Sequence, residues 1–320
     1  MKIKNIKFLL HLTIFFLLTY LLFFPLESCL FDPNDYKQLM RDFVKNISIY
    51  AKSIIPNFII IPQNGVEIID ELYLLYIDGI GQEDFFYGFY ADDIATPQDE
   101  RDYLLNFINI AKDEGKTILI IDYCKTKDYI DDSYQKNNEL GFISFAADHR
   151  QLDNIPSYPV SPYNENNNNI NSLSDAKNFL YIINPSSYNS KQEFIKALKE
   201  TNYDIIIIDL FFYDQIFTKD EVESLKIKKN GAARLIICYM SIGEAEDYRY
   251  YWQDSWYIDP PSFLAAENPN WQGNYKVKYW DPVWQAIIYG NDQSYLKKII
   301  DAGFDGVYLD IIDAYEYFEK

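Results

Sequence analysis

The chain has 320 residues, of which 48% are hydrophobic, enough for one large barrel or two ordinary domains with a substantial core. Its formal net charge of −19 at pH 7 argues against a nucleic-acid partner, because an acidic surface repels phosphates. The same charge would attract a cationic ligand, including a sugar polymer with free amines. The alternative is that the acidity only keeps the protein soluble.

The N-terminal residues have the pattern of an export signal. Three lysines precede a mostly apolar run from Phe8 to Phe24, and Ser28-Cys29 follows. This order is typical of a bacterial lipoprotein signal. We therefore expect a signal peptide over residues 1–28, lipidation at Cys29, a tether over 29–35 and a folded domain over 36–320. Plain secretion and an uncleaved membrane anchor are the alternatives, and each of the three places the domain outside the cytoplasm.

Few metal-binding or nucleophilic side chains remain after this signal. Cys124 and Cys238 each lie in an apolar run, which favours free buried thiols over a disulfide. His149 is the one histidine left, and it cannot form a zinc site with two separated cysteines. We expect no metal and no cofactor, and carboxylates are left as the candidates for acid and base.

Short apolar runs alternate with helix-like stretches along the chain. The expected strands cover residues 57–61, 73–78, 117–122, 179–183, 204–209, 234–240, 275–280 and 305–310, with a weaker run at 141–146. The expected helices cover residues 35–52, 97–113, 190–200 and 291–302. Continuous apolar strands between helices indicate parallel β-structure, and eight such units favour a (β/α)8 TIM-type barrel. An open doubly wound sheet is the alternative, but no expected strand is followed by a Gly-rich dinucleotide-binding turn.

Residues 156–174 interrupt this pattern. The segment contains three prolines and four consecutive asparagines, and it indicates a loop or linker without a core of its own.

Polar residues cluster where the expected strands end. In a barrel, the active site forms at the carboxyl ends of the strands, so these residues are candidates for binding and catalysis. They are Asn64, Asp78, Asp122, Asp209, Glu244 and Asp310. Carboxylates held close together shift each other's pKa values, which separates an acid from a base. The alternative is that the aspartates cap the helices that follow.

All five tryptophans lie between residues 252 and 284, together with several tyrosines. Prolines, a glycine and asparagines mark much of this stretch as loop. Aromatic faces stack on sugar rings, so the stretch indicates a sugar-binding cleft, and core packing is the alternative.

Several long motifs resemble glycoside hydrolase family 114, the endo-α-1,4-polygalactosaminidase family, whose bacterial branch was long mislabelled as cysteinyl-tRNA synthetase-like. They are SIGEAEDYRYYW (241–252), ENPNWQGNYKVKYWDPVW (267–284), GFDGVYLDIIDAYEYF (303–318), NFIIIPQNG (57–65), YIDGIGQEDFFYG (76–88) and GKTILIIDYC (115–124). The resemblance covers nearly all of residues 36–320. The sequence has no nucleotide-binding histidine motif that would support the synthetase label.

The order of these motifs differs from that of the family. In relatives the DAYEYF segment precedes the PQNG segment, whereas here PQNG comes near the start. The resemblance therefore implies a circularly permuted (β/α)8 barrel, in which residues 156–174 join the ancestral termini. This interpretation predicts that the strand at 305–310 lies beside the strand at 57–61.

The resemblance also implies the catalytic residues. By motif position Asp310 is the nucleophile or base and Glu83 the general acid/base, the two carboxylates that glycosidic cleavage needs. Asp78 is an alternative partner for Asp310. The supporting residues would be Asn64, Asp122, Asp209, Glu244 and Asp313, with Tyr239 and Trp280 as aromatic platforms.

The resemblance implies an endo-acting hydrolase of an α-1,4-linked, galactosamine-containing polysaccharide. We further expect a monomer that is tethered to a membrane by its N-terminal lipid. A catalytically inactive carbohydrate-binding lipoprotein is the second hypothesis, and an interaction protein of the cell envelope is the third.

Overall fold

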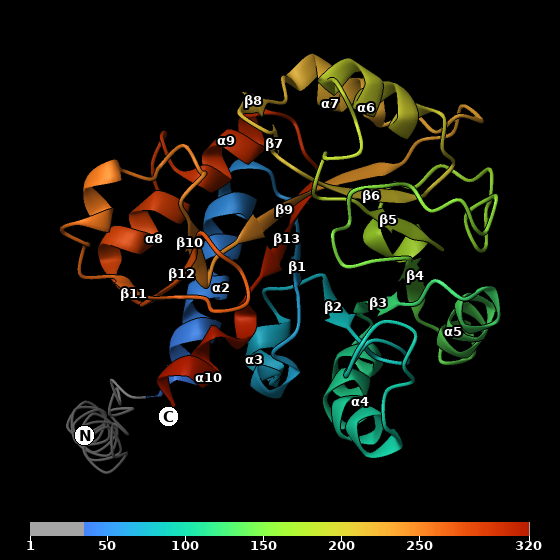
Figure 1. Ribbon diagram of the computed structural model, residues 1–320, viewed down its shortest axis with the longest axis horizontal. Coiled ribbons are helices and arrows are strands. Elements are labelled where there is room, and N and C mark those ends of the chain that lie inside the picture. Colours follow the sequence, from blue (N-terminus) through green and yellow to red (C-terminus); the bar gives the residue numbers. More distant parts are fainter. Residues whose placement is uncertain (1–34, 320) are drawn as a thin grey trace, which may run out of the picture. The chain divides into compact units, whose positions relative to one another are not determined.

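The computed structural model describes residues 35–319, and Tyr36–Lys320 form one compact unit (Figure 1). The expected signal peptide, the lipidation site Cys29 and almost all of the tether lie outside the described residues. Within residues 35–319, no helix is both long and apolar enough to cross a bilayer.

Two parallel sheets form the centre of this unit. The larger has the order β1 (Ile59–Pro62), β13 (Gly306–Asp310), β9 (Leu235–Ser241), β6 (Ile205–Asp209) and β5 (Phe179–Tyr181). The smaller has the order β2 (Gly79–Glu83), β3 (Thr117–Tyr123) and β4 (Ile143–Ala147). A parallel bridge between Gln63 and Gly81 links β1 to β2, and β4 contacts β5. The fold is therefore mixed α/β, with eight parallel strands in two linked sheets.

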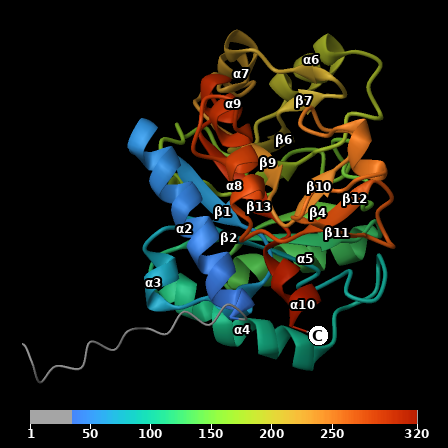
Figure 2. The ribbon, with the colours of Figure 1, turned by 90° about the vertical axis from the view of Figure 1, so that its left-hand side faces the viewer.

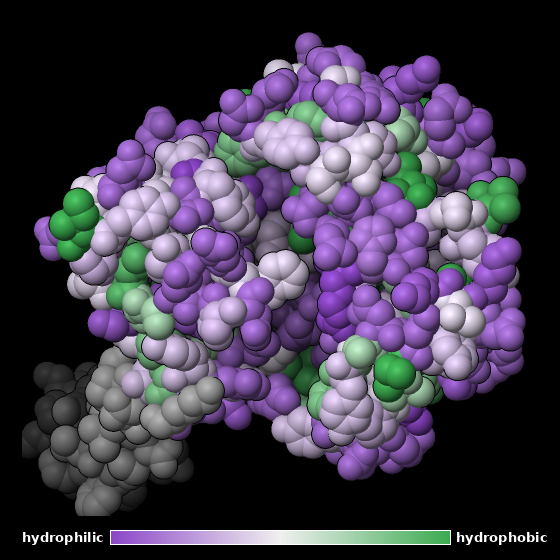
Figure 3. Space-filling view, in the orientation of Figure 1, coloured by the Kyte–Doolittle hydropathy of each residue, from purple (hydrophilic) through white to green (hydrophobic). Residues whose placement is uncertain are grey.

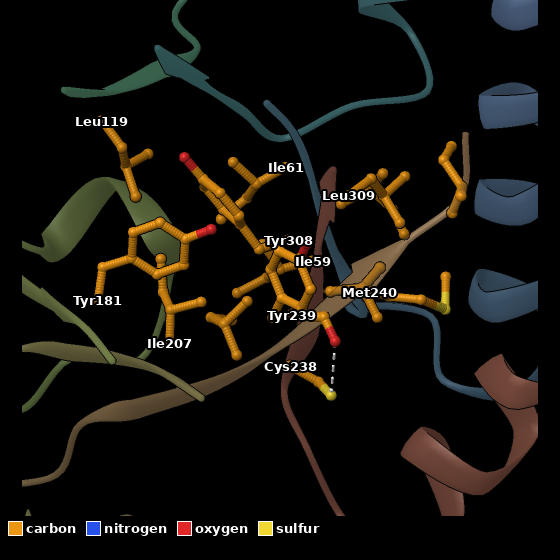
Figure 4. Packing of buried hydrophobic residues seen from close by; sticks show 14 of the residues in the cluster. Ile59, Ile61, Leu119, Tyr181, Ile207, Cys238, Tyr239, Met240, Tyr308 and Leu309 are labelled. Atoms are coloured by element: carbon orange, nitrogen blue, oxygen red, sulfur yellow. Dashed lines mark hydrogen bonds between the residues drawn. The ribbon is translucent and has the colours of Figure 1, made fainter. Parts of the chain in front are cut away.

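The strands are buried on both faces, as their continuous apolar sequences predicted. In β6, residues Ile205 to Ile208 are all fully buried. Large side chains from different strands fill the space between the sheets, where the rings of Tyr181 and Tyr308 lie 5.2 Å apart (Figure 4). Cys238 belongs to this core, and both it and Cys124 are free buried thiols, as expected.

Helices surround the strands. The longer ones are α2 (Tyr36–Ile54), α4 (Gln98–Asp113), α5 (Lys127–Glu139), α6 (Lys191–Lys199), α7 (Lys219–Leu225), α8 (Pro282–Ile288) and α9 (Tyr295–Asp301). Two short helices, α3 (Glu71–Leu74) and α10 (Tyr315–Phe318), complete the set within residues 35–319. The expected helices at 35–52, 97–113 and 190–200 are confirmed, and the one at 291–302 is shorter. One face of α2 is buried, and the helix contacts α9 and α10 (Figure 2).

Two of the expected parallel strands are wrong. Residues 73–78 contain the end of α3, and the strand follows at Gly79–Glu83. Residues 274–277 form β12, the centre of a small antiparallel sheet with β10 (Glu244–Glu246) and β11 (Leu264–Glu267). The weaker apolar run at 141–146 corresponds to β4. Two hairpin strands, β7 (Phe211–Phe212) and β8 (Gln215–Ile216), lie between β6 and α7.

The predicted neighbourhood of residues 57–61 and 305–310 is confirmed. Strands β1 and β13 are parallel neighbours in register from Ile59 opposite Gly306 to Pro62 opposite Leu309. A glycine is required at position 306, because a Cβ there would lie 2.4 Å from the carbonyl oxygen of Ile59. Strands from the two ends of the described chain therefore lie side by side.

The Asn-rich segment has no regular structure until a short 3-10 turn, Leu173–Asp175, but polar contacts hold it in place. Lys228 forms an ion pair with Asp204 in which both side chains are fully buried. The ammonium of Lys228 also donates to the backbone carbonyl of Asn168 at 2.9 Å. The amide of Asn166 donates to Asp204 at 2.9 Å. The linker is therefore fastened to the ends of the strands where β6 and β9 begin.

Candidate active site

A cavity of about 570 Å³ lies at the carboxyl ends of the parallel strands. A hydrophilic hollow near the centre of the molecular face is visible in Figure 3. Seven of the site residues predicted from the sequence line this cavity, namely Asn64, Glu83, Asp209, Tyr239, Glu244, Asp310 and Asp313. The two parallel sheets thus bring together side chains that are far apart in the sequence.

Glu83 is the last residue of β2, and two side chains donate to its carboxylate. The hydroxyl of Tyr123, at the end of β3, donates to Oε1, and the amide of Asn64 donates to Oε2 at 3.2 Å. The side-chain oxygen of Asn64 also accepts from the Glu83 backbone N–H at 3.0 Å. Asn64 has a φ of 60°, a left-handed conformation that asparagine tolerates better than most residues. The turn after β1 therefore orients Glu83.

Asp310 is the last residue of β13. Its Oδ2 accepts from the Tyr239 hydroxyl at 2.6 Å, and its Oδ1 accepts from the Ile311 backbone N–H at 2.8 Å. Ile311 has a φ of 63°, which is strained for a β-branched residue. This strained turn places a backbone donor against the carboxylate.

The negative charge of Glu83 affects the ionisation of Asp310. Burial, followed by the negative charge of Glu83, raises the pKa of Asp310 to about 8, and the hydrogen bond from Tyr239 opposes this rise. Two like charges held in one buried site disfavour double ionisation. Burial and the nearby negative charge of Glu83 therefore make ionisation of Asp310 less favourable than for an aspartate in water.

Arg249 is a buried cavity residue that sequence reasoning missed. Its guanidinium makes two hydrogen bonds to Asp209, at 2.8 and 2.6 Å, and forms an ion pair with Glu246. Burial raises the pKa of Asp209, although Arg249 opposes the rise. The three-residue spacing of Glu246 and Arg249 was the available signal. Asp209 is therefore held as one partner of an ion-pair cluster.

Glu244 has a buried carboxylate that is only half satisfied. Its side chain is 1% exposed, and Oε1 accepts from Lys276 at 2.7 Å and from Asn268 at 2.8 Å. Its Oε2 has no hydrogen-bond partner among the described residues. Burial and the neighbouring carboxylates of Glu316, Glu83 and Glu244 raise the pKa of Asp313 to about 6, against the opposing charge of Lys276. The unpaired oxygen of Glu244 is itself buried, so the contacts with Lys276 and Asn268 hold this side chain in place.

The structure corrects three of the predicted binding residues, none of which lines the cavity. Asp78 precedes β2, where it accepts from the Ile60 backbone N–H at 2.9 Å and pairs with Lys52 at 3.0 Å. It therefore lies at the amino ends of the strands, opposite the site, and it is not the partner of Asp310. Asp122 is fully buried and accepts from the Ser133 hydroxyl of α5 and from the backbone of Phe86, so it is structural.

The third correction is Trp280, which packs against Phe318 with ring centroids 4.7 Å apart. The tryptophan-rich stretch mostly fills the interior, since Trp284 is fully buried and Trp252 packs against Trp256. Trp271, between β11 and β12, is the exception, because it lines the cavity and is 54% exposed. Tyr239, the other predicted aromatic platform, does line the cavity, and its hydroxyl donates a hydrogen bond to Asp310.

Three curated relatives, all of them uncharacterized proteins, match parts of the chain. One from Methanocaldococcus jannaschii is 42% identical over 187 residues, which cover 56% of this chain and 49% of that protein. One from Thermotoga maritima is 41% identical over 130 residues, covering 38% and 36% respectively. One from Deinococcus radiodurans is 38% identical over 122 residues, covering 38% and 37%. The chain therefore spans half or less of the length of each of these relatives.

A protein-family model gives the assignment. The model of glycoside-hydrolase family GH114 matches residues 161–320, half of the chain. This range contains the Asp310 and Asp209 carboxylates and the Arg249 cluster, whereas Glu83 lies outside it. The chain belongs to glycoside hydrolase family GH114.

Proposed function

We propose that the protein is an endo-acting glycoside hydrolase that cleaves α-1,4-linked, galactosamine-containing polysaccharide with Asp310 and Glu83. Membership of GH114 supports glycoside hydrolase activity. The observation that carries the residue assignment is that these carboxylates line one cavity, interact electrostatically and each accept a tyrosine hydroxyl.

In the proposed reaction one carboxyl group protonates the leaving glycosidic oxygen, and the other attacks or stabilises the oxocarbenium-like centre. We assign the first role to Glu83, as general acid/base, and the second to Asp310, as nucleophile or base. The two carboxyl groups line one cavity, and a proton donor and a carboxylate in one site are what this reaction requires. The Tyr239 hydroxyl and the Ile311 N–H both donate to Asp310 and lower its pKa, so they favour its ionised form against the effect of burial.

The charge of the cavity supports an amine-bearing substrate. Six carboxylate side chains line it, namely Glu83, Asp209, Glu244, Glu246, Asp310 and Asp313, against two arginines. Both arginines are already paired with carboxylates. We propose that these carboxylates attract an ammonium group of the substrate, and that the exposed ring of Trp271 stacks on a sugar.

We further propose that the eight parallel strands close a circularly permuted (β/α)8 barrel. The pairing of β1 with β13 and the contact of β4 with β5 support closure. The GH114 match begins at residue 161, inside the Asn-rich segment, so residues 36–155 precede the matched region rather than follow it. Export as a lipoprotein remains a prediction, which labelling of the native chain and a Cys29→Ala variant with radioactive fatty acid would test.

The decisive assay compares deacetylated and acetylated α-1,4-galactosaminan as substrates. Wild type should release reducing ends from the deacetylated polymer, and Asp310→Asn and Glu83→Gln should each abolish release while retaining binding. Asp259→Asn, at an exposed aspartate outside the cavity, is the matched control and should retain activity. Binding without release by wild type would contradict hydrolysis and favour the carbohydrate-binding lipoprotein. If wild type neither binds nor cleaves either polymer, the result would favour the third hypothesis, an interaction protein of the cell envelope.

A further inference from the structure

Arg150, in the loop after β4, lies against one of the two tyrosines that contact the catalytic pair. The guanidinium carbon of Arg150 is 4.2 Å from the centroid of the Tyr123 ring. Tyr123 ends β3 and is 3% exposed, whereas the Arg150 side chain is 36% exposed, so the contact is shielded from water on the tyrosine side. A cation over an aromatic face is attracted by the ring, and more strongly when the contact is desolvated. The geometry is therefore that of a firm cation–π contact beside the cavity.

The same tyrosine donates its hydroxyl to Oε1 of Glu83. Burial and the charge of Glu83 raise the pKa of Tyr123, whereas the charge of Arg150 lowers it. A positive charge next to a phenol makes its O–H a better donor, because it stabilises the electron density left on oxygen. Arg150 therefore favours the hydrogen bond that Tyr123 makes to Glu83.

Contacts on the far side of the guanidinium fix its position. Its Nη2 donates to Asp84 at 2.8 Å and to the Gly88 carbonyl at 2.6 Å, and its Nε donates to Asp92 at 2.9 Å. Asp84 directly follows Glu83 and has a φ of 57°. A Cβ on Gly88 would lie 1.9 Å from an Asp84 carboxylate oxygen, so the loop closes tightly around this cluster. The arginine is committed to these acceptors rather than left free for a ligand.

We propose that Arg150 is a positioning residue that orients Glu83 through the ring of Tyr123. The inference rests on the proposed function, because Glu83 is taken as the general acid/base. It also adds a role to the 84–92 loop, whose carboxylates hold the guanidinium over the ring. Arg150 makes no hydrogen bond or ion pair to either catalytic carboxylate in the described structure, and its contacts are with the tyrosine ring and the loop.

A double-mutant cycle tests this route. Tyr123→Phe should lower kcat about tenfold to a hundredfold, the range for losing a hydrogen bond to a charged group. Arg150→Gln should lower kcat with little change in KM, and Arg150→Lys should recover part of the loss because it keeps the charge. In the Tyr123→Phe background, Arg150→Gln should have little further effect, since coupled residues are not additive. The control is Arg101→Gln, which removes a cation 5.5 Å from the Phe86 ring outside the cavity and should leave kcat unchanged.

Additive losses in the cycle would overturn the proposal, and so would a rise in KM alone, which would make Arg150 a substrate-binding residue. A readout that needs no turnover separates this failure from failure of the proposed function. With ¹³C-labelled tyrosine, the Cζ resonance of Tyr123 should move in both Arg150→Gln and Glu83→Gln and stay in place in Arg101→Gln. If the Tyr123 Cζ resonance has the same position in Arg150→Gln as in wild type, the proposed contact is refuted, even if the wild type proves inactive.

Discussion

Replacing Tyr239 with phenylalanine removes the hydroxyl that donates to the carboxylate of Asp310 and keeps the aromatic ring. The hydroxyl donates to Oδ2 of Asp310 at 2.6 Å, which leaves only the Ile311 backbone N–H on the other oxygen. A hydrogen bond to a charged group contributes about 1.5–3 kcal/mol, and one pKa unit corresponds to about 1.4 kcal/mol. The pKa of Asp310, already raised by burial and by Glu83, should therefore rise by roughly a further one to two units.

The sign of the effect on activity follows from the role of Asp310. In the proposed mechanism the carboxylate of Asp310 is the active form, so activity should fall as the pH drops through its pKa. In Tyr239→Phe the acidic limb of the kcat/KM profile should move to higher pH by about one to two units. The assay is reducing-end release across the pH range, with Tyr250→Phe as a control, because that hydroxyl contacts the Gln293 carbonyl outside the pair. An unmoved limb, or one that moves to lower pH, would refute the reasoning.

Two further substitutions test the fold. Lys228→Met leaves the carboxylate of Asp204 buried without its cation and should lower the free energy of unfolding by about 3–5 kcal/mol, measured by urea denaturation. Adding Asp204→Asn should recover much of that loss, and a single-mutant loss below about 1 kcal/mol would contradict a structural ion pair. Gly81→Ala places a Cβ 1.9 Å from the Tyr308 hydroxyl, so overpacking should cost about 1–3 kcal/mol or more in the same assay. A wild-type denaturation midpoint in this variant would show that the contact relaxes freely.

The apolar pattern predicted the strands that consist of large aliphatic side chains, and it failed where the structure needs small ones. Strand β6 is a run of isoleucines, and its position was clear from the sequence. Strand β2 has the sequence GIGQE. Gly81 needs to be small because Tyr308 fills the space beside it, and the sequence around Gly81 does not reveal this distant contact. The apolar pattern therefore predicts a strand at residues 73–78, which overlaps the end of α3 and stops before β2 begins. This error also placed Asp78 at the wrong end of the sheet.

The sequence predicted the site residues that lie at strand ends, but it did not predict which of their side chains point into the cavity. Successive residues of a strand point to opposite faces, so in β3 the inward direction of Tyr123 turns Asp122 outward to α5. The sequence shows both residues at the strand end but not which one faces the cavity. Likewise, the spacing of Glu246 and Arg249 is visible in the sequence, but only the folded chain brings Arg249 against Asp209 at the end of β6.

The juxtaposition of β1 and β13 brings together two separate parts of the chain, each of which supplies one carboxylate of the proposed catalytic pair. The region matched by the GH114 model holds Asp310, whereas Glu83 belongs to the part before it. Cleavage in the Asn-rich segment would yield two pieces, each with one carboxylate of the pair. Neither piece could hydrolyse a glycosidic bond alone by the two-carboxylate route, and recovered activity after mixing them would report directly on reassembly of the strands.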